Sequence, residues 1–561
     1  MAVLVLSSAF ANEATALESD LEMLGVPFET TTDISRALRG PVVVLAGTLT
    51  NTAFSPADRE RLYAYVDSGG VVFATHVQGN QFFPLFGLAE FRSRRENFGV
   101  RFVDSDQDGS LRYINRPEEQ EIRLGNPDRY QEVNWTTEYT LAGAEALGHF
   151  PNGAVAFARN YYRRGIAYCL GLSFSDFTLR PALGQSYEAE QEWANVFAPS
   201  ADVLRLLLRG LYESAVHPFT LIHTIPDGKE TALLLSHDID ARESFRNSAV
   251  FVALEERYGV TSTFFVTTKY FTDSTDIGYY NAERVAHIRH VDAQGFDIGA
   301  HTVSHLETFD QLPLGDPEVN FESYRPRQAP TVYGEVKVSK ELLDRDIPGQ
   351  RTVSFRAGFL RHPPQLIRAL EAAGYKVDSS HAAGNTLTNY AHRAMREARL
   401  GAPVTDLIEI PVTLDDSRGY LTPNNVDEVV AHWMDIIAAN AENNAITCLL
   451  IHPTDTTYKL EAEERLLQAY VDKPVWIGDV TRFGLFARER ARVRVAAFAN
   501  GSQLLLRLNR PRAALPPGLT LVVESGLPWA SVTVEDSEAK IIPFATLVRP
   551  DRNFLLLEPE G

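Results

Sequence analysis

Two segments of the sequence end in side chains that are typical ligands of a metal ion. The apolar run "LLLSHDID" ends in Asp238 and Asp240, and "GAHTVSHLETF" places His301 and His305 four residues apart. Two imidazoles and one carboxylate form a three-ligand set that leaves one position for water, which is the pattern of a catalytic zinc site. A bound Zn²⁺ lowers the pKa of its water to about 7 and polarises a carbonyl oxygen, so this set predicts hydrolysis of an amide or an ester.

Three further polar residues follow apolar runs elsewhere in the chain. Arg356, Asp378 and His452 each come where a strand-like segment stops. The carboxyl ends of the strands of a parallel barrel meet at one mouth, so we expect these side chains beside the metal ligands. A carboxylate that takes a proton from water and a histidine that gives one to a leaving amine each contribute roughly 10²–10⁴-fold to such a reaction. Two histidines four apart are a weak signal alone, but a helical turn would bring both to one side.

Alternating strands and helices are predicted around these residues, from 216 to 487. The strand-like segments are "ALLLSHDID", "TSTFFVT", "FDIGAHT", "TVSFRAGF", "YKVDSS", "LIEIPVT" and "TCLLIHP". Helical stretches such as "PPQLIRALEAAG" separate most of them. This order predicts a distorted (β/α) barrel, complete or incomplete, as the catalytic domain.

The preceding part of the chain, residues 1–215, has a similar alternation. Its strands "AVLVLSS", "PVVVLAG" and "VVFATH" are apolar throughout, which predicts a parallel sheet covered on both faces. This part resembles the class I glutamine amidotransferase-like domains, whose fold is flavodoxin-like and doubly wound. The turn that carries the nucleophilic Cys in that family reads "FATHVQGN" here, with Thr75 and His76 and no Cys. We therefore expect a non-catalytic α/β domain, in which His76 is structural or lies at the surface.

The last part of the chain, residues 488–561, changes to short alternating strands. Asn500-Gly501 is a hairpin signal, and "LTLVVESG", "ASVTVED" and "NFLLLEP" follow with turn residues between them. The pattern predicts a small all-β sandwich.

The predicted barrel resembles the polysaccharide deacetylases of carbohydrate esterase family 4, the NodB-homology domain, over about half of the chain. The first motif of that family commonly reads Thr-Phe-Asp-Asp-Gly, and "SHDID" is a variant with one residue between the carboxylates. The resemblance implies that Asp238 is the catalytic base and Asp240 a metal ligand. The second motif, His-Thr/Ser-x-x-His, is matched in full by "HTVSH", which implies that His301 and His305 are the imidazole ligands.

The remaining motifs of the family are matched in part. The third normally reads Arg-x-Pro-aromatic, and "RAGF" keeps Arg356 and Phe359 but has Gly358 where a Pro is usual. The resemblance implies that Arg356 pairs with the catalytic Asp and that the backbone N–H of Phe359 helps to hold the oxyanion. In "GYKVDSS", Asp378 would orient the catalytic acid, although the tryptophan often found there is missing, and in "LLIHP", His452 would be that acid.

Taken together, the residues and the resemblance imply a zinc-dependent hydrolase, or one that uses another divalent transition metal, that removes N-acetyl groups from an amino-sugar polysaccharide or oligosaccharide. Two alternatives stay open. The same scaffold with an Asp-x-Asp first motif also occurs in family members that hydrolyse small cyclic amides and imides. A non-enzymatic carbohydrate-binding or assembly protein is the other alternative, and the intact ligand set speaks against it.

Composition excludes other classes of partner. The net charge of −20 argues against nucleic acid and anionic membranes. Two cysteines allow neither a disulfide framework nor a Cys-type zinc cluster. No apolar run reaches the roughly 18–20 residues that span a bilayer. The start "MAVLVLSS" has no basic residues before a short apolar run, so we interpret it as a strand. This predicts a cytoplasmic protein if the chain is complete and an extracytoplasmic one if a leader was removed, with an oligomeric state that the sequence does not indicate.

Overall fold

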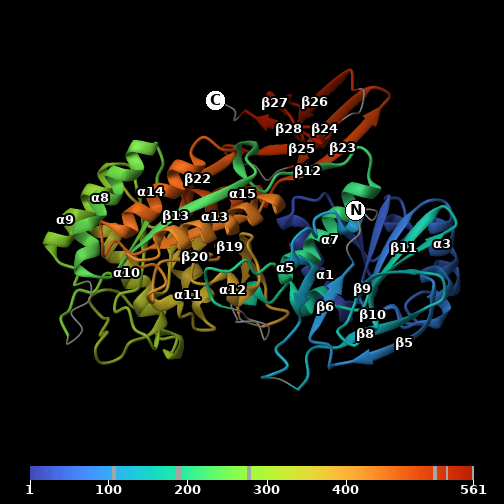
Figure 1. The fold of residues 1–561 in the computed structure, drawn as a ribbon, viewed down its shortest axis with the longest axis horizontal. Coiled ribbons are helices and arrows are strands. Elements are labelled where there is room, and N and C mark those ends of the chain that lie inside the picture. Colours follow the sequence, from blue (N-terminus) through green and yellow to red (C-terminus); the bar gives the residue numbers. More distant parts are fainter. Residues whose placement is uncertain are drawn as a thin grey trace.

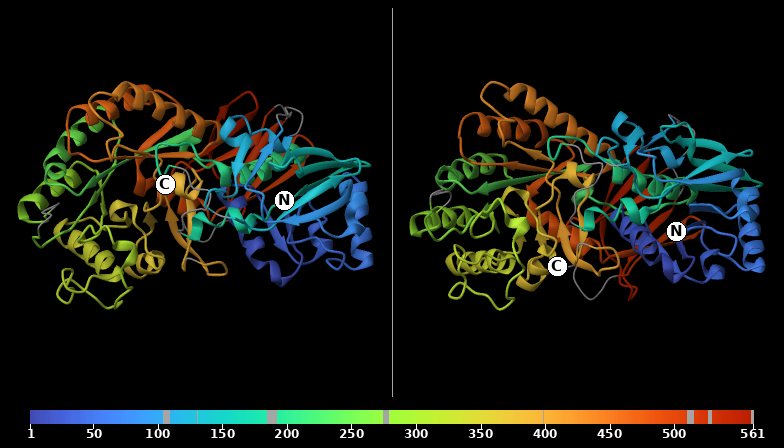
Figure 2. Two further views of the ribbon diagram at one scale, coloured as in Figure 1. Left: turned by 60° about the horizontal axis from the view of Figure 1, so that its bottom comes forward. Right: turned by 90° about the horizontal axis from the view of Figure 1, so that it is seen from below.

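The chain folds into an N-terminal α/β region, a barrel region and a C-terminal β region, which lie against one another (Figure 1). The N-terminal region and the barrel region lie side by side along the long axis of the molecule, and Figure 2 shows the same arrangement from two other directions. The computed structural model describes residues 1–103, 109–129, 131–183, 192–273, 279–397, 399–509, 515–525 and 529–558.

One sheet forms the centre of the N-terminal region. Its parallel half contains, in spatial order, β2 (Glu29–Thr31), β1 (Ala2–Val5), β3 (Val42–Ala46), β4 (Val71–Thr75) and β11 (Gly165–Leu170). Antiparallel strands continue it as β10 (Val155–Tyr162), β9 (Glu145–His149), β6 (Gly99–Phe102) and β7 (Glu121–Arg123), with β8 (Thr136–Leu141) and β5 (Leu88–Arg94) to the side. Strands β10 and β11 form an antiparallel hairpin.

Helices cover both faces of the parallel half. Successive strand residues point to opposite faces. Val3 packs in the core that includes α1 (Ala11–Met23) and α7 (Ser200–Ala215), whereas Leu4 packs in the core that includes α3 (Pro56–Asp67). The hydroxyl of Ser55 accepts a hydrogen bond from the backbone N–H of Asp58 and so begins α3. The short helices of this region are α2 (Ile34–Ala37), α4 (Phe83–Phe86), α5 (Pro117–Gln120) and α6 (Phe174–Phe177).

The barrel region contains a curled, largely parallel sheet. Its order is β18 (His392–Met395), β19 (Val404–Glu409), β17 (Val377–Asp378), β16 (Ser354–Phe355), β15 (Asp297–Ala300), β14 (Thr263–Val266), β13 (Thr231–Ile239), β21 (Ile446–Ile451) and β20 (Leu414–Asp415). A further strand, β22 (Val475–Asp479), pairs with β13. Each of the seven strand-like segments of the sequence overlaps one of these strands.

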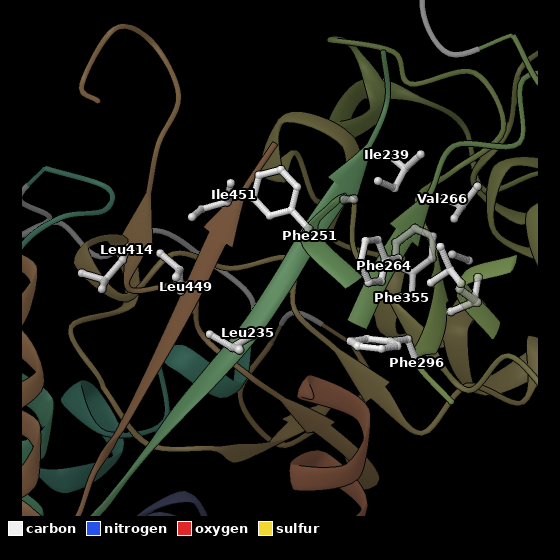
Figure 3. Close-up of a cluster of buried hydrophobic side chains, with 14 of the residues drawn as sticks. Leu235, Ile239, Phe251, Phe264, Val266, Phe296, Phe355, Leu414, Leu449 and Ile451 are labelled. Carbon is white, nitrogen blue, oxygen red and sulfur yellow. The ribbon is translucent and has the colours of Figure 1, made fainter. Parts of the chain in front are cut away.

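Long helices surround this sheet. They are α8 (Arg242–Tyr258), α9 (Ala282–Ala293), α10 (Val332–Asp346), α11 (Leu366–Ala373), α13 (Val426–Asn443), α14 (Tyr458–Tyr470) and α15 (Val480–Arg490), and α12 (Ala383–Thr386) is a short helix between strands. Leu235 of β13 packs with Phe251 and Phe264 in the core under these helices (Figure 3). Leu234, which points the other way, packs with Cys448 in a second core. The rows of apolar residues in the strands are therefore buried on both faces, as in other parallel sheets.

Two small sheets make up the C-terminal β region. One contains β23 (Arg494–Asn500), β24 (Gln503–Asn509) and β26 (Ser531–Glu535), and the other β12 (Thr220–Ile222), β25 (Thr520–Glu524), β28 (Arg552–Leu557) and β27 (Phe544–Val548). Side chains of both sheets, such as Leu506 and Leu521, share one apolar core. Strand β12 lies in the sequence range that was predicted to belong to the barrel, but it pairs with β25. Among the helices of the described ranges, none is both long and apolar enough to cross a lipid bilayer.

Candidate functional site

The candidate residues around the metal-ligand set lie where four parallel strands of the barrel sheet end. Asp238 belongs to β13, and Asp240 follows it directly; His301 follows β15, Arg356 follows β16, and His452 follows β21. Because these strands run in the same direction, their carboxyl ends lie along one edge of the sheet.

Asp240, His301 and His305 form a compact group of possible metal ligands. One donor atom of each lies within 4.8 Å of the other two. The Nδ1 of His301 donates to the carbonyl oxygen of Arg356 at 2.9 Å, so its buried Nε2 carries a lone pair that has no hydrogen-bond partner. The Nε2 of His305 lies 3.6 Å from a carboxylate oxygen of Asp240. A buried imidazole nitrogen without a partner is costly, and a backbone carbonyl that sets the tautomer is typical of metal-binding histidines. These residues therefore fit a divalent ion such as Zn²⁺.

The "HTVSH" segment is a loop, and the helical turn expected for it is not formed. Thr302 has φ +63° and His305 has φ +51°, both in the left-handed region. The buried carboxylate of Glu335 on α10 holds the loop: it accepts hydrogen bonds from the backbone N–H groups of Val303 and Ser304 at 2.9 and 2.7 Å. The two imidazole rings still lie near each other, with centroids 4.9 Å apart.

Asp238 lies beside this group and is paired with Arg356. The guanidinium donates to the Asp238 carboxylate at 2.9 Å, and both side chains are buried. The other oxygen of Asp238 is 3.5 Å from Nε2 of His301. Burial alone would raise the pKa of Asp238, but the neighbouring side chains of His301, Arg356 and His452 outweigh it and lower the pKa below its usual value. Asp238 is therefore held as a carboxylate.

His452 is held by Asp416, a residue that the sequence did not indicate. Its Nδ1 lies 2.7 Å from one oxygen of Asp416, and Lys459 lies 2.7 Å from the other. Nε2 of His452 points toward Asp240, at 3.9 Å. Burial lowers the pKa of His452, but the nearby carboxylates, led by that of Asp416, overcome this and raise the pKa to about 10. Asp416 directly follows β20, shortly after the predicted strand-like segment "LIEIPVT", so the same strand-end signal could have found it.

Asp378 lies in a different group from the one predicted. Its carboxylate accepts hydrogen bonds from the Ser379 backbone at 2.9 Å and from the Ser380 hydroxyl, and it lies near Glu409 and His381. Burial and the charge of Glu409 raise its pKa well above the usual value. The carboxylate that bonds to His452 is that of Asp416, and the described residues show no hydrogen bond or ion pair between Asp378 and His452.

Phe359 and Gly358 border the metal-ligand group. The Phe359 ring is 42% exposed and lies 4.4 Å from the ring of His305, centroid to centroid. A Cβ atom at position 358 would come within 2.7 Å of Cδ2 of His305. The glycine in "RAGF" is thus explained by the close approach of this histidine.

A cleft of ≈ 520 Å³ opens next to these residues. It is lined by Glu192, Trp193, Asp310, Phe359, Leu360, Arg361, His362, Ala382, Asn385 and Arg418. Trp193 comes from the segment that precedes α7, outside the predicted barrel. Asn195 anchors this segment, because its side chain pairs with the backbone of Asp415 at 2.8 and 3.0 Å. The sequence carried no signal for this contribution.

Comparison with known proteins agrees with part of this description. Residues 227–377 match the family model described as polysaccharide deacetylase. No curated protein matches the chain significantly. One similar solved structure is a putative polysaccharide deacetylase from Mycobacterium smegmatis, with 17% sequence identity and a TM-score of 0.37 over 47% of this chain and 92% of that one. A family 4 carbohydrate esterase from Streptomyces lividans has 14% identity and a TM-score of 0.28, over 45% of this chain and 93% of that one. The allantoinase Puue has 14% identity and a TM-score of 0.34, over 46% of this chain and 91% of that one.

Proposed function

We propose that this protein is a metal-dependent deacetylase that hydrolyses N-acetyl groups of an amino-sugar polysaccharide. The observation that carries the proposal is the convergence of Asp240, His301 and His305, with Asp238 and His452 on either side. The match of residues 227–377 to the polysaccharide deacetylase model supports the same reaction class.

The three ligands would hold Zn²⁺ or another divalent transition metal, which supplies Lewis acidity toward a carbonyl oxygen and toward water. Asp238 is the base that accepts the proton of the attacking water, since Arg356 stabilises its ionised form. The backbone N–H of Phe359 contributes to the binding of the oxyanion at the rim of the site.

His452 is the acid that protonates the leaving nitrogen. His452 can act as a general acid because Asp416 raises its pKa to about 10, so that the imidazole carries a proton at neutral pH. Asp416, rather than Asp378, is the orienting carboxylate, and Lys459 holds it from the other side. The products are acetate and a free amine on the sugar.

The shape of the adjoining cleft favours a sugar polymer over a small cyclic amide. The cleft is open to solvent, and its lining includes the exposed Phe359 ring and the partly buried Trp193, with the Arg418 guanidinium 5.3 Å from the Trp193 ring centroid. Aromatic faces of this kind pack on the C–H faces of sugar rings, whereas hydrolysis of a small imide needs only an enclosed pocket.

Metal content and product release test the proposal together. We expect one equivalent of zinc in the wild type, loss of most of it in His301→Ala, and acetate release from N-acetylglucosamine oligomers only when zinc is bound. The matched control is His290→Ala, an exposed histidine on α9, which should keep both properties. Zinc binding without acetate release, together with ring opening of a small imide, would favour the cyclic-amide alternative, and zinc binding without either reaction would favour a binding protein.

A further inference from the structure

A second hollow lies in the N-terminal region, where its parallel strands end. It has a volume of ≈ 500 Å³ and is lined by the residues that follow β1, β3 and β4 and by the first turn of α1. In the sheet, β1 lies between β2 and β3. The chain therefore passes from β1 to its neighbour on one side, β2, and then crosses to its neighbour on the other side, β3, so the direction of winding reverses at β1. Doubly wound sheets bind ligands at this reversal, outside the carboxyl ends of the strands.

The inner wall of this cavity is a fixed arrangement of polar groups. The buried carboxylate of Glu13 accepts hydrogen bonds from the backbone N–H groups of Phe174 and Ser175, at 3.0 and 2.9 Å. It also accepts one from the hydroxyl of Ser173, which lies 2.9 Å from the hydroxyl of Ser175. Glu13 is thus satisfied by the protein, and its effect is to hold two serine hydroxyls in the wall of the cavity.

His76 adds an imidazole to the same cavity. Its backbone has φ +47°, a conformation that is unfavourable for a residue with a side chain, and it is only 8% exposed. Nδ1 pairs with the hydroxyl of Thr137 at 2.8 Å, and Nε2 has no hydrogen-bond partner among the described residues. Burial lowers the pKa of His76 to about 4, so the ring is neutral and can accept or donate one further hydrogen bond.

The remaining lining restricts the chemistry of a ligand. Trp135, at the rim, is 59% exposed, which is unusual for so large an apolar side chain. The described lining contains the carboxylates of Glu13 and Asp176 and neither lysine nor arginine. The guanidinium of Arg95 lies over the Trp135 ring, 5.6 Å from its centroid, but is paired with Glu132, so a phosphate or carboxylate ligand would meet no unpaired cation among these residues. Hydroxyl, amide and neutral imidazole groups below one exposed indole match a sugar ring, which has hydroxyls at its edge and C–H groups on its faces.

We propose that this cavity binds one ring of an uncharged saccharide, such as a hexose or an N-acetylated amino sugar. Trp135 stacks on the face of the ring, and His76, Ser173 and Ser175 bond to its hydroxyls. The site is separate from the deacetylase centre and does not depend on the reaction proposed there. For a polymer long enough to reach both places, it would add a second point of attachment.

Calorimetric titration of the full chain tests this assignment. The ligands are hexamers of N-acetylglucosamine and of glucose, with glucose 6-phosphate as the anionic comparison. We expect Trp135→Ala and His76→Gln to weaken binding of the neutral oligomers about tenfold each, the effect of losing one aromatic contact or one hydrogen bond. The matched control is Tyr161→Ala, which removes a 63% exposed aromatic ring from β10 of the same sheet and should bind like the wild type.

Equal affinities of the wild type and the three variants for the neutral oligomers would overturn the proposal. Tighter binding of glucose 6-phosphate than of the neutral oligomers would overturn it as well. Thermal unfolding of each variant shows whether it is folded, and since Trp135 is largely exposed its removal should leave the melting temperature unchanged. Acetate release from a short N-acetylglucosamine oligomer, measured in parallel, should be the same in Trp135→Ala and wild type. Failure of acetate release in every protein would contradict the deacetylase and leave the cavity assignment standing.

Discussion

At the scale of single residues, the pair formed by His452 and Asp416 makes the sharpest prediction. Asp416→Asn keeps the shape of the side chain but removes the charge that raises the pKa of His452. We expect kcat to fall roughly 100-fold, within the range for general acids, and the loss to grow with pH as the imidazole gives up its proton. The pH profile of kcat with a defined oligomer measures this.

The control for this prediction is Asp427→Asn on α13, whose carboxylate is 91% exposed and pairs with Arg465 at the surface. A pH profile of Asp416→Asn that runs parallel to that of the wild type would mean that Asp416 only supports the fold. Asp378→Asn should change kcat less than Asp416→Asn, because the Asp378 carboxylate bonds to Ser379 and Ser380.

The residues of the site differ in how far the sequence could predict them. Asp238, Asp240, His301 and His305 lie in short motifs, so their spacing is visible in the printed chain. Asp416 is 36 residues from His452, and Trp193 comes from a different part of the fold. No local pattern links such residues, because only tertiary packing brings them to the site.

At the scale of elements, the loop that carries both histidines depends on a helix behind it. Glu335 of α10 accepts two backbone N–H groups of the loop and the hydroxyl of Ser304. In Glu335→Gln, one of the two acceptor oxygens becomes an NH₂ group. Either the two loop N–H groups, which share Oε2, or the hydroxyls of Ser304 and Tyr324, which share Oε1, then lose their acceptor, and the left-handed loop residues lose part of their support. We expect zinc affinity to fall 10- to 100-fold, as is typical when a partner of the ligands is removed. Competition with a chelator measures the affinity.

Glu341→Gln is the matched control, because Glu341 also lies on α10 and accepts a loop N–H, that of Phe321, but is exposed. Unchanged zinc affinity in Glu335→Gln would show that the loop keeps its shape without the carboxylate.

A buried cluster of one histidine and two glutamates links β13 to the helices behind it and makes the free energy of unfolding depend on pH. His237 of β13 contacts Glu255 of α8 at 2.7 Å and lies 3.8 Å from Glu463 of α14. Burial raises the pKa of Glu255 to about 8, so the folded protein keeps a proton that the unfolded chain loses above about pH 4.5. This contribution to stability is complete below pH 4.5 and is lost as the pH rises to about 8, with a slope of about 1.4 kcal/mol per pH unit.

Glu255→Gln keeps a neutral side chain at every pH and should therefore flatten this decline. Melting temperatures of the wild type and the variant from pH 6 to 8.5 would measure this change in slope. His237 does not contribute to it, because burial lowers the pKa of His237 and the imidazole is neutral in the folded protein over this range. Parallel curves for wild type and Glu255→Gln would mean that Glu255 titrates normally in the folded protein.

Secondary structure followed from the sequence where burial alone decides it. Apolar runs predicted the barrel strands because both faces of those strands are covered. The helical turn expected for the loop of His301 and His305 was wrong. Two histidines four residues apart suggested that turn, whereas hydrogen bonds to the buried Glu335 stabilise another backbone conformation. Strand β12 lies in the range predicted for the barrel but pairs with β25, because a segment as short as Thr220–Ile222 does not indicate its pairing partner.

At the scale of the whole molecule, a buried ionic group connects the N-terminal region to the barrel. Arg205 of α7 contacts Asp20 of α1 at 2.8 Å and Asp202 at 2.7 Å, and it donates to the hydroxyl of Thr388 in the barrel region at 3.0 Å. Asp202 also accepts the backbone N–H of Asn389 at 2.7 Å. The two regions therefore share one satisfied charge network, and we expect them to unfold together.

Arg205→Ala tests this coupling. It leaves two buried carboxylates without their cation, a change that typically costs about 3–5 kcal/mol, and it removes a contact between the regions at the same time. We expect differential scanning calorimetry to show a lower melting temperature and a single wild-type transition split into two. Arg36→Ala, which breaks the exposed pair with Glu29, should leave the calorimetric trace unchanged.

Because the segment that carries Trp193 also leads into α7, Arg205→Ala should raise KM for long oligomers more than it lowers kcat. A single transition at a lower temperature, with KM unchanged, would show that the network stabilises the chain without positioning the cleft.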